Sequence, residues 1–158
     1  MERTFGDFKS AEELEKTAES LRAEGDLESL KTLAKENGID EEDAEDYFNG
    51  EFQPLASDKV MALGRLEMEK SEIQLHGIFE DWFGYIIMQV DRSEKMRKAV
   101  LLKPLSGCLG ALMKWSFEQC KPVDDAIVKA AGIHASVKLG IPSMAQAQEI
   151  IREYYEVE

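Results

Sequence analysis

Acidic side chains form the densest cluster of chemically capable groups in this chain, and they directly follow Asp40. Five of them lie within six consecutive residues: Glu41, Glu42, Asp43, Glu45 and Asp46. Clustered carboxylates can ligate a cation, transfer protons, or present a negatively charged surface to another protein. The spacing of the cluster and its sequence context decide which of these is feasible.

The spacing of these acids argues against a calcium site. A calcium loop of the EF-hand type needs oxygen ligands at alternate positions and a glycine at its sixth position. Counted from Asp40, the sixth residue is Glu45. The segment instead has the pattern of a helix that begins after a capping aspartate. No metal ligand is therefore assigned to this cluster.

The side chains that most often act as metal ligands or nucleophiles are few and scattered: His76, Cys108, Cys120 and His134. Neither histidine lies at ligand spacing from a second histidine or a cysteine, as a zinc site would require. A nucleophile also needs a base and an orienting group beside it, and the sequence brings no such set together. We therefore expect no enzyme activity, no cofactor and no metal.

Two interpretations of the acidic cluster remain. In the simpler one, the carboxylates form a solvated helix face, and those in the first turn are favoured by the helix dipole. In the other, they stand in for the phosphates of a nucleic-acid backbone and bind a basic groove on a partner protein. The second interpretation makes the five acids the candidate partner-binding residues.

The net charge of the chain excludes one broad class of function. With a charge of −13 over 158 residues, the protein is not expected to bind nucleic acid directly through a phosphate-neutralising surface. The acids concentrate in residues 1–53, which hold 17 acidic and 6 basic side chains, whereas residues 92–121 hold seven basic and two acidic ones. Either the acidic segment packs against the basic one, or the molecule presents two oppositely charged ends to partners.

The sequence predicts a cytoplasmic protein. Its first residues are neither apolar nor basic enough for an export signal. No apolar run approaches the roughly 20 residues that cross a bilayer, so no membrane association is expected. Cys108 and Cys120 are twelve positions apart, about 18 Å along a continuous helix, which is too far for a mutual disulfide. Both thiols are expected to be reduced and buried.

Helix-capping residues predict three short helices in residues 1–53. Ser10, Asp26 and Asp40 each precede a stretch with apolar residues at three- and four-residue spacing. The second and third helices resemble a helix-turn-helix, but the would-be recognition helix carries the acidic cluster and no basic residue, which is unsuitable for contacting phosphates. We therefore predict an acidic three-helix unit that does not read DNA.

After a linker at residues 51–57, a second domain is predicted over residues 58–158, organised around one strongly apolar helix. Residues 71–90 carry apolar and aromatic side chains on one broad face, with Glu80, Asp81 and Gln89 on the other. Other helices are expected to cover that face. The fold class is thus all-α: a small acidic three-helix N-terminal unit plus a C-terminal helical bundle around the 71–90 helix.

Local signals place the remaining elements. Helices are expected to begin after Ser93, at Pro104, after Asp124, and after Ser143 with Gln146 as a capping box. The one place where a strand is allowed is the segment 133–139. Small residues mark close approaches: Gly64 permits one, and Gly107 and Gly110 are expected to admit an aromatic side chain of the 71–90 helix.

Two phrases carry a family resemblance: LAKENGIDEEDAEDYFNG at residues 33–50 and LGIPSMAQAQEIIREYY at residues 139–155. Together with the capped acidic N-terminus, they resemble small acidic proteins carried by mobile elements and prophages of Firmicutes. Some proteins of that kind are anti-CRISPR inhibitors of effector nucleases. The resemblance implies an interaction protein, and it transfers no catalytic residue.

The functional prediction is a non-enzymatic protein-binding inhibitor, of the anti-CRISPR type, which blocks an effector nuclease through an acidic surface that mimics nucleic acid. Its partner is expected to be a protein with a basic surface. The alternative is a helical adaptor or self-associating regulatory protein of a mobile element. That protein would bind through an apolar patch around Phe5, Phe8, Phe52 and Tyr155. The oligomeric state is left open by the sequence.

Overall fold

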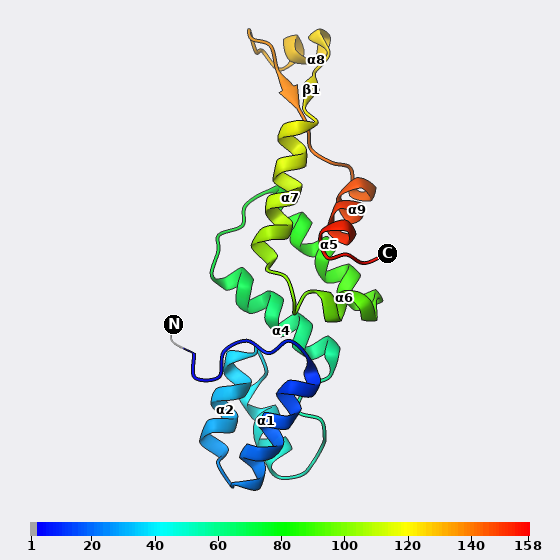
Figure 1. The fold of residues 1–158 in the computed structure, drawn as a ribbon. Helices are drawn as coiled ribbons and strands as arrows, with labels where there is room; N and C mark the ends of the chain where they lie inside the picture. Colours follow the sequence, from blue (N-terminus) through cyan, green and yellow to red (C-terminus); the bar gives the residue numbers. More distant parts are fainter. Residues whose placement is uncertain (1–2) are drawn as a thin grey trace.

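Two hydrophobic cores follow one another along an elongated, mostly helical molecule (Figure 1). The computed structural model describes residues 3–158. Its helices are α1 (Ala11–Ala23), α2 (Leu27–Glu36), α3 (Glu41–Phe48), α4 (Asp58–Ser71), α5 (Ile78–Arg92), α6 (Glu94–Ala99), α7 (Leu105–Glu118), α8 (Asp125–Ala130) and α9 (Met144–Tyr154). Two short strands, β1 (Lys121–Pro122) and β2 (Lys138–Leu139), pair antiparallel. The prediction of an all-α fold is confirmed.

The first core belongs to the acidic N-terminal unit, where α1, α2 and α3 pack together. The predicted caps form: Glu13 N–H donates to Ser10 at 3.2 Å, Ser29 N–H to Asp26 at 3.1 Å, and Glu42 N–H to Asp40 at 2.9 Å. Each cap satisfies a backbone donor that would otherwise have no partner at the helix start. Apolar side chains fill the interior, namely Leu14, Ala18, Leu30, Leu33, Ala34, Ile39, Ala44 and Tyr47.

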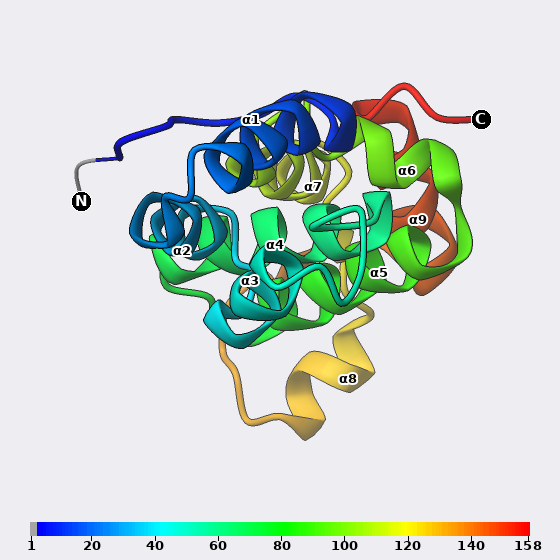
Figure 2. The same ribbon diagram turned by 90° about the horizontal axis from the view of Figure 1, so that it is seen from below.

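The second core is built around α5, which supplies Trp82, Phe83, Ile86 and Val90 to it. Helices α4, α6, α7 and α9 cover these side chains (Figures 1 and 2). The Ser143–Gln146 capping box that opens α9 is present as predicted. An apolar helix of this kind needs neighbours on most of its circumference, and the C-terminal bundle provides them.

The predicted start of the central helix at residue 71 is wrong. Ser71 is the last residue of α4, and α5 starts only at Ile78, after Gly77 with φ 61°. The non-helical segment between them contains Ile73 and Leu75, which pack against the second core although they lie outside any helix. Gln89 is also misplaced by the prediction: it is buried, and its amide donates to the Gln148 carbonyl of α9 at 2.9 Å.

Helix α4 contributes to both cores. Its Met61 lies in the first core, and its Ala62 and Leu66 lie in the second. Between them, Gly64 packs against the backbone of Asn37 and Gly38 at the α2–α3 turn, so closely that a Cβ on Gly64 would lie 2.3 Å from the Asn37 carbonyl oxygen. The predicted close approach at Gly64 is therefore confirmed, and it joins the N-terminal unit to the bundle.

The aromatic partner predicted for the glycines of α7 is wrong. A Cβ on Gly107 would lie 2.2 Å from the Tyr154 hydroxyl, and Tyr154 belongs to α9. That hydroxyl donates to the Pro104 carbonyl at 2.8 Å. A Cβ on Gly110 would meet nothing within 4 Å, so this glycine faces open space.

A small arm, residues 119–143, projects from the far end of α7 (Figure 1). It contains β1, α8 and β2, and in Figure 2 α8 lies outside the outline of the bundle. Strand β2 falls inside the predicted 133–139 segment, whereas β1 was not predicted. Most of the arm is exposed, including Cys120, which contradicts the prediction of two buried thiols. Its buried residues are Val128, at 9% exposure, and Pro142.

Candidate protein-binding surfaces

The five predicted partner-binding acids lie on the outer side of α3. Four of them are exposed, namely Glu41, Glu42, Asp43 and Glu45, and Asp46 is half-buried. Ala44 and Tyr47 occupy the core side of the same helix. Residues three and four apart on a helix are neighbours, with Cβ atoms about 5–6 Å apart. The cluster thus presents a row of carboxylates to solvent.

One basic side chain touches this row. Lys31 of α2 forms an ion pair with Glu45 at 2.7 Å. Hydrogen bonding to Glu45 raises the pKa of Lys31, and the charges of Glu28 and Glu41 add to the effect. No other lysine or arginine of residues 3–158 forms an ion pair with the five acids. The surface therefore keeps a strong negative charge.

Two other acids of the N-terminal unit have structural contacts instead. Buried Glu36 accepts the backbone N–H groups of Thr4 and Phe5, both at 3.0 Å. Glu15 accepts the Tyr47 hydroxyl at 3.0 Å and the Leu55 N–H at 2.9 Å. Burial and this hydrogen bond to Glu15 raise the pKa of Tyr47 to about 12. These carboxylates fix the N-terminal segment and the 51–57 linker onto the helices.

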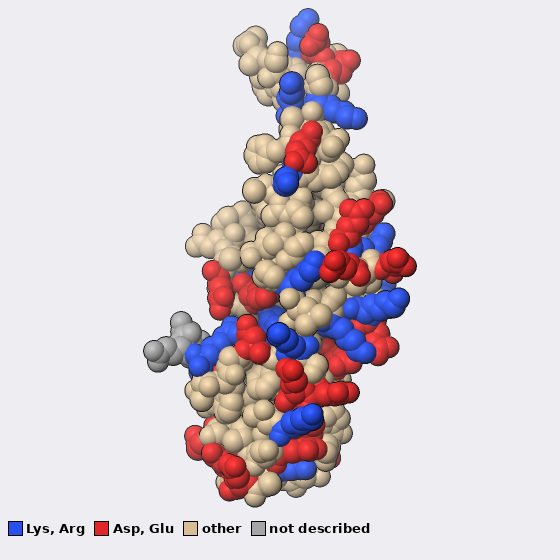
Figure 3. All heavy atoms as spheres, viewed as in Figure 1, with Lys and Arg blue, Asp and Glu red and all other residues tan. Residues whose placement is uncertain are grey.

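The basic segment 92–121 does not pair with the acidic unit in the described structure. Three of its lysines, Lys98, Lys103 and Lys114, form ion pairs with acids of the C-terminal bundle. Leu101 is the residue of this segment that enters the first core. Lysine and arginine side chains gather at the middle of the molecule in Figure 3, and acidic ones are dense over the N-terminal unit. Among residues 3–158 no ion pair joins the two parts, which meet through the packing of Leu101 and through Arg65 of α4, a donor to the Leu101 and Phe8 carbonyls.

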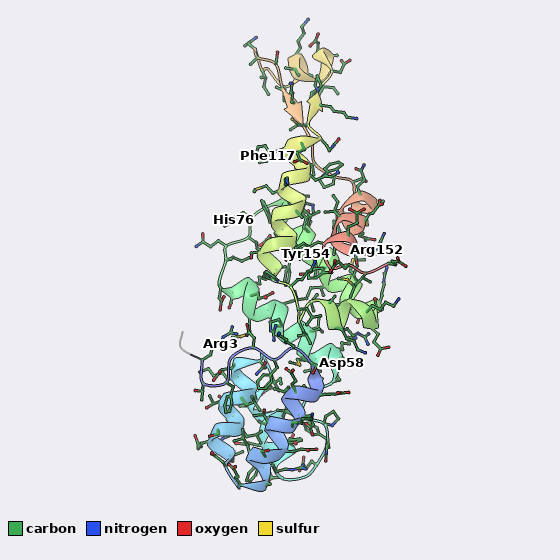
Figure 4. All side chains as sticks on the ribbon, in the orientation of Figure 1. Arg3, Asp58, His76, Phe117, Arg152 and Tyr154 are labelled. Atoms are coloured by element: carbon green, nitrogen blue, oxygen red, sulfur yellow. The ribbon has the colours of Figure 1, made fainter. Side chains whose placement is uncertain are left out.

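The scattered nucleophiles and histidines are not brought together into a site. Cys108 is buried in the second core, and burial raises the pKa of its thiol to about 12, which keeps it protonated at neutral pH. His76 is exposed in the segment between α4 and α5 (Figure 4). His134 lies on the arm, beside a hollow of about 400 Å³. Among residues 3–158, no three histidine, cysteine or acidic side chains are grouped to hold a metal ion.

Glu69 is a half-buried carboxylate between α4 and the start of α7. Burial raises the pKa of this α4 side chain above its ordinary value of 4.5, although it accepts the Leu105 N–H at 3.1 Å and Arg65 lies near it. Because α7 begins after Pro104 with no side-chain cap of its own, Glu69 supplies the missing acceptor from another helix.

A Glu69→Gln variant is expected to become more stable relative to the wild type as pH rises. Since the folded protein holds a proton on Glu69 to higher pH than the unfolded chain does, this group lowers wild-type stability as pH rises above about 4.5. The variant should therefore gain relative to wild type between pH 4 and 7, by less than about 1 kcal/mol because the site stays partly solvated. Urea unfolding of both proteins across this range tests it. A wild-type advantage that grows with pH would contradict the assignment.

The apolar patch predicted around the aromatic residues does not exist as one surface. Phe5 and Phe8 pack on the first core, while Tyr155 is buried in the second. Phe52 alone is exposed, beside Tyr47. Apart from Leu102 between α6 and α7, the most exposed large apolar side chains lie on α7 and the arm: Phe117, Ile127, Leu139 and Ile141. Sequence reasoning missed this surface.

No helix among the described residues is long and apolar enough to span a membrane. Comparisons with protein-family models, curated proteins and solved structures found no match to this chain.

Proposed function

We propose that this chain is a non-enzymatic inhibitor that binds a basic, nucleic-acid-binding groove of a partner protein through the acidic surface of α3. An effector nuclease of a CRISPR system is the partner that the sequence resemblance favours. The inhibitor would act by occupying the groove in place of nucleic acid, so it needs no catalytic group of its own.

The observation that carries this proposal is the row of exposed carboxylates on α3. Four of the five are exposed, and Glu45 alone has an ion-pair partner among residues 3–158. A basic groove attracts such a row at long range and can pair with its members in sequence. A helix with only a structural role needs some charged residues on its outer side for solubility. It does not need an acid at nearly every outer position.

The way the acidic unit is held supports the same proposal. The α2–α3 turn is locked against Gly64 of α4, and Glu36 and Glu15 fix the flanking segments. A charged surface on a rigid support binds with a smaller loss of conformational freedom than one on a mobile tail.

The test is a titration of the protein into a CRISPR effector nuclease with guide RNA and target DNA. A variant with all five acids as amides (E41Q, E42Q, D43N, E45Q, D46N) is expected to inhibit at least about tenfold more weakly, because it removes the attracting charge. Wild-type inhibition should also weaken between about 0.05 M and about 0.3 M salt, since exposed charge pairs are screened.

A matched control distinguishes the effect of the α3 surface from the effect of net charge. Converting five exposed acids of the C-terminal part to amides (Glu80, Asp81, Asp125, Glu149 and Glu153) changes the net charge equally and leaves α3 intact. This control should inhibit like wild type. Equal losses in both variants, or full inhibition by the α3 variant with its fold verified by circular dichroism, would contradict the proposal.

A second candidate function, a helical adaptor or self-associating regulatory protein, is favoured by a different observation. Apolar side chains are exposed on α7, far from the acidic helix, with Phe117 at 75% exposure. Binding through such a surface would depend weakly on salt. Retained partner binding by the five-amide variant would support this candidate over the first.

A further inference from the structure

One side of α7 carries apolar side chains, and the bundle covers it only toward the start of the helix, where Leu109 is 5% exposed and belongs to the second core. Leu109, Met113 and Phe117 recur every four residues, so they lie along one side of the helix with Ser106 and Gly110 beside them. We call these five residues the α7 strip. Met113 is 45% exposed and Phe117 is 75% exposed. Exposed apolar side chains that form a continuous patch mark a candidate interaction surface.

A hollow of about 270 Å³ adjoins the lower part of the strip. It is lined by Ile73, Gln74, Leu75, Phe79, Ser106, Leu109, Gly110 and Met113, none of which is charged. Gly110 contributes open space, because a Cβ there would meet nothing. Phe117 lies beyond the hollow on the same side of the molecule as His76 (Figure 4). One face thus bears both a protruding ring and an empty apolar hollow.

We propose that this face binds a second copy of the chain, with the two α7 helices antiparallel across a two-fold axis at Met113. Leu109 and Phe117 are each four residues from Met113, in opposite directions. The axis therefore places Phe117 of each copy over the partner's apolar hollow, which Leu109 helps to line. A two-fold interface requires such self-complementarity, because the same patch must serve both subunits.

Charge favours the antiparallel arrangement over others. Each copy has a net charge of −13, concentrated in the N-terminal unit, so two copies repel unless those units are kept apart. Antiparallel α7 helices place the two acidic units at opposite ends of the dimer. Lys121 lies in β1, just beyond the C-terminal end of α7, and the exposed Glu72 shares a hollow with Leu105 at the other end of the helix. The antiparallel arrangement therefore brings Lys121 of each copy toward Glu72 of the other, twice in the dimer.

The size of the surface sets the expected strength. Helix α7 has 14 residues and is about 21 Å long, so the strip and hollow form an interface at the small end of specific ones. Such interfaces dissociate in the micromolar range or above. Association through this face is independent of the proposed inhibitory surface on α3, and the five-amide variant should dimerise at least as well as wild type.

The test is sedimentation velocity of the full chain from about 5 to about 500 µM. The wild type should pass from monomer to dimer over this range. Phe117→Glu and Met113→Glu should each raise the dissociation constant at least about tenfold, because they bury a charge in an apolar contact. Ile127→Glu on α8, also an exposed apolar site at 64% exposure, is the matched control and should dimerise like wild type.

A charge exchange tests the orientation of the helices. Lys121→Glu and Glu72→Lys should each weaken the dimer by placing like charges together, and the double variant should restore it. Circular dichroism and urea unfolding verify the fold of each variant, since Glu72 also lies 3.4 Å from Arg3. A monomer at every concentration, dimers that persist in Phe117→Glu and Met113→Glu, or no recovery in the double variant would overturn the proposal.

Discussion

Replacing Arg65 with alanine is expected to lower the free energy of unfolding by about 3 kcal/mol. This α4 side chain is 8% exposed, and it donates to the Leu101 carbonyl at 3.1 Å and to the Phe8 carbonyl. Its removal leaves two carbonyl groups without their charged donor and opens a void between the two cores. Each loss is large in a buried setting because water does not replace the missing contact.

Urea unfolding measures the effect of the Arg65→Ala variant. Arg65→Lys keeps the charge but lacks the planar, forked donor, so it should lose an intermediate amount. The control is Arg92→Ala at the exposed end of α5, which should change stability by less than about 0.5 kcal/mol. A loss in Arg65→Ala no larger than this control would show that the guanidinium does not join the two cores.

Replacing Gly64 with alanine is expected to destabilise the protein by about 2 kcal/mol. In an ordinary helix interior this change would stabilise by about 1 kcal/mol, because alanine favours helix. Here the added Cβ would lie 2.3 Å from the Asn37 carbonyl oxygen and 3.2 Å from that of Gly38. The clash is with backbone, which cannot rotate away, so steric repulsion outweighs the gain in helix propensity.

The control for Gly64→Ala is Gly84→Ala in α5, where a Cβ would meet nothing within 4 Å. This variant should be neutral or stabilised by up to about 1 kcal/mol. Thermal and urea unfolding of both variants give the comparison. Gains of similar size at both positions would mean that the α2–α3 turn moves off α4 at little cost.

Sequence reasoning predicted the parts of the fold that depend on local chemistry. Caps at Ser10, Asp26, Asp40 and Ser143 involve residues within three positions of one another, so their pattern is visible in one dimension. The start of α5 was missed because Ile73 and Leu75 continue the apolar pattern although Gly77 interrupts the helix. An apolar pattern indicates which residues are buried. It does not distinguish a helix from a non-helical segment that packs on the same core.

The candidate surfaces were predicted in part for the same reason. The acids of α3 belong to one short helix, and their exposure follows from the burial of Ala44 and Tyr47 beside them. The inward roles of Glu15 and Glu36 depend on partners 31 to 40 positions away in the chain. The α7 strip could have been suspected, because α7 is apolar around most of its circumference, and such a helix needs cover on more than one side.

Because α4 contributes side chains to both cores, the rotation along this helix sets the orientation of the acidic unit relative to the C-terminal bundle. Met61 and Leu66 point into different cores from positions five residues apart. Each residue of an α-helix advances the phase by about 100°. A single insertion or deletion between them would therefore turn the acidic unit by about that angle relative to the C-terminal bundle. The number of residues between Met61 and Leu66 thus sets the direction in which the α3 carboxylates face relative to α7.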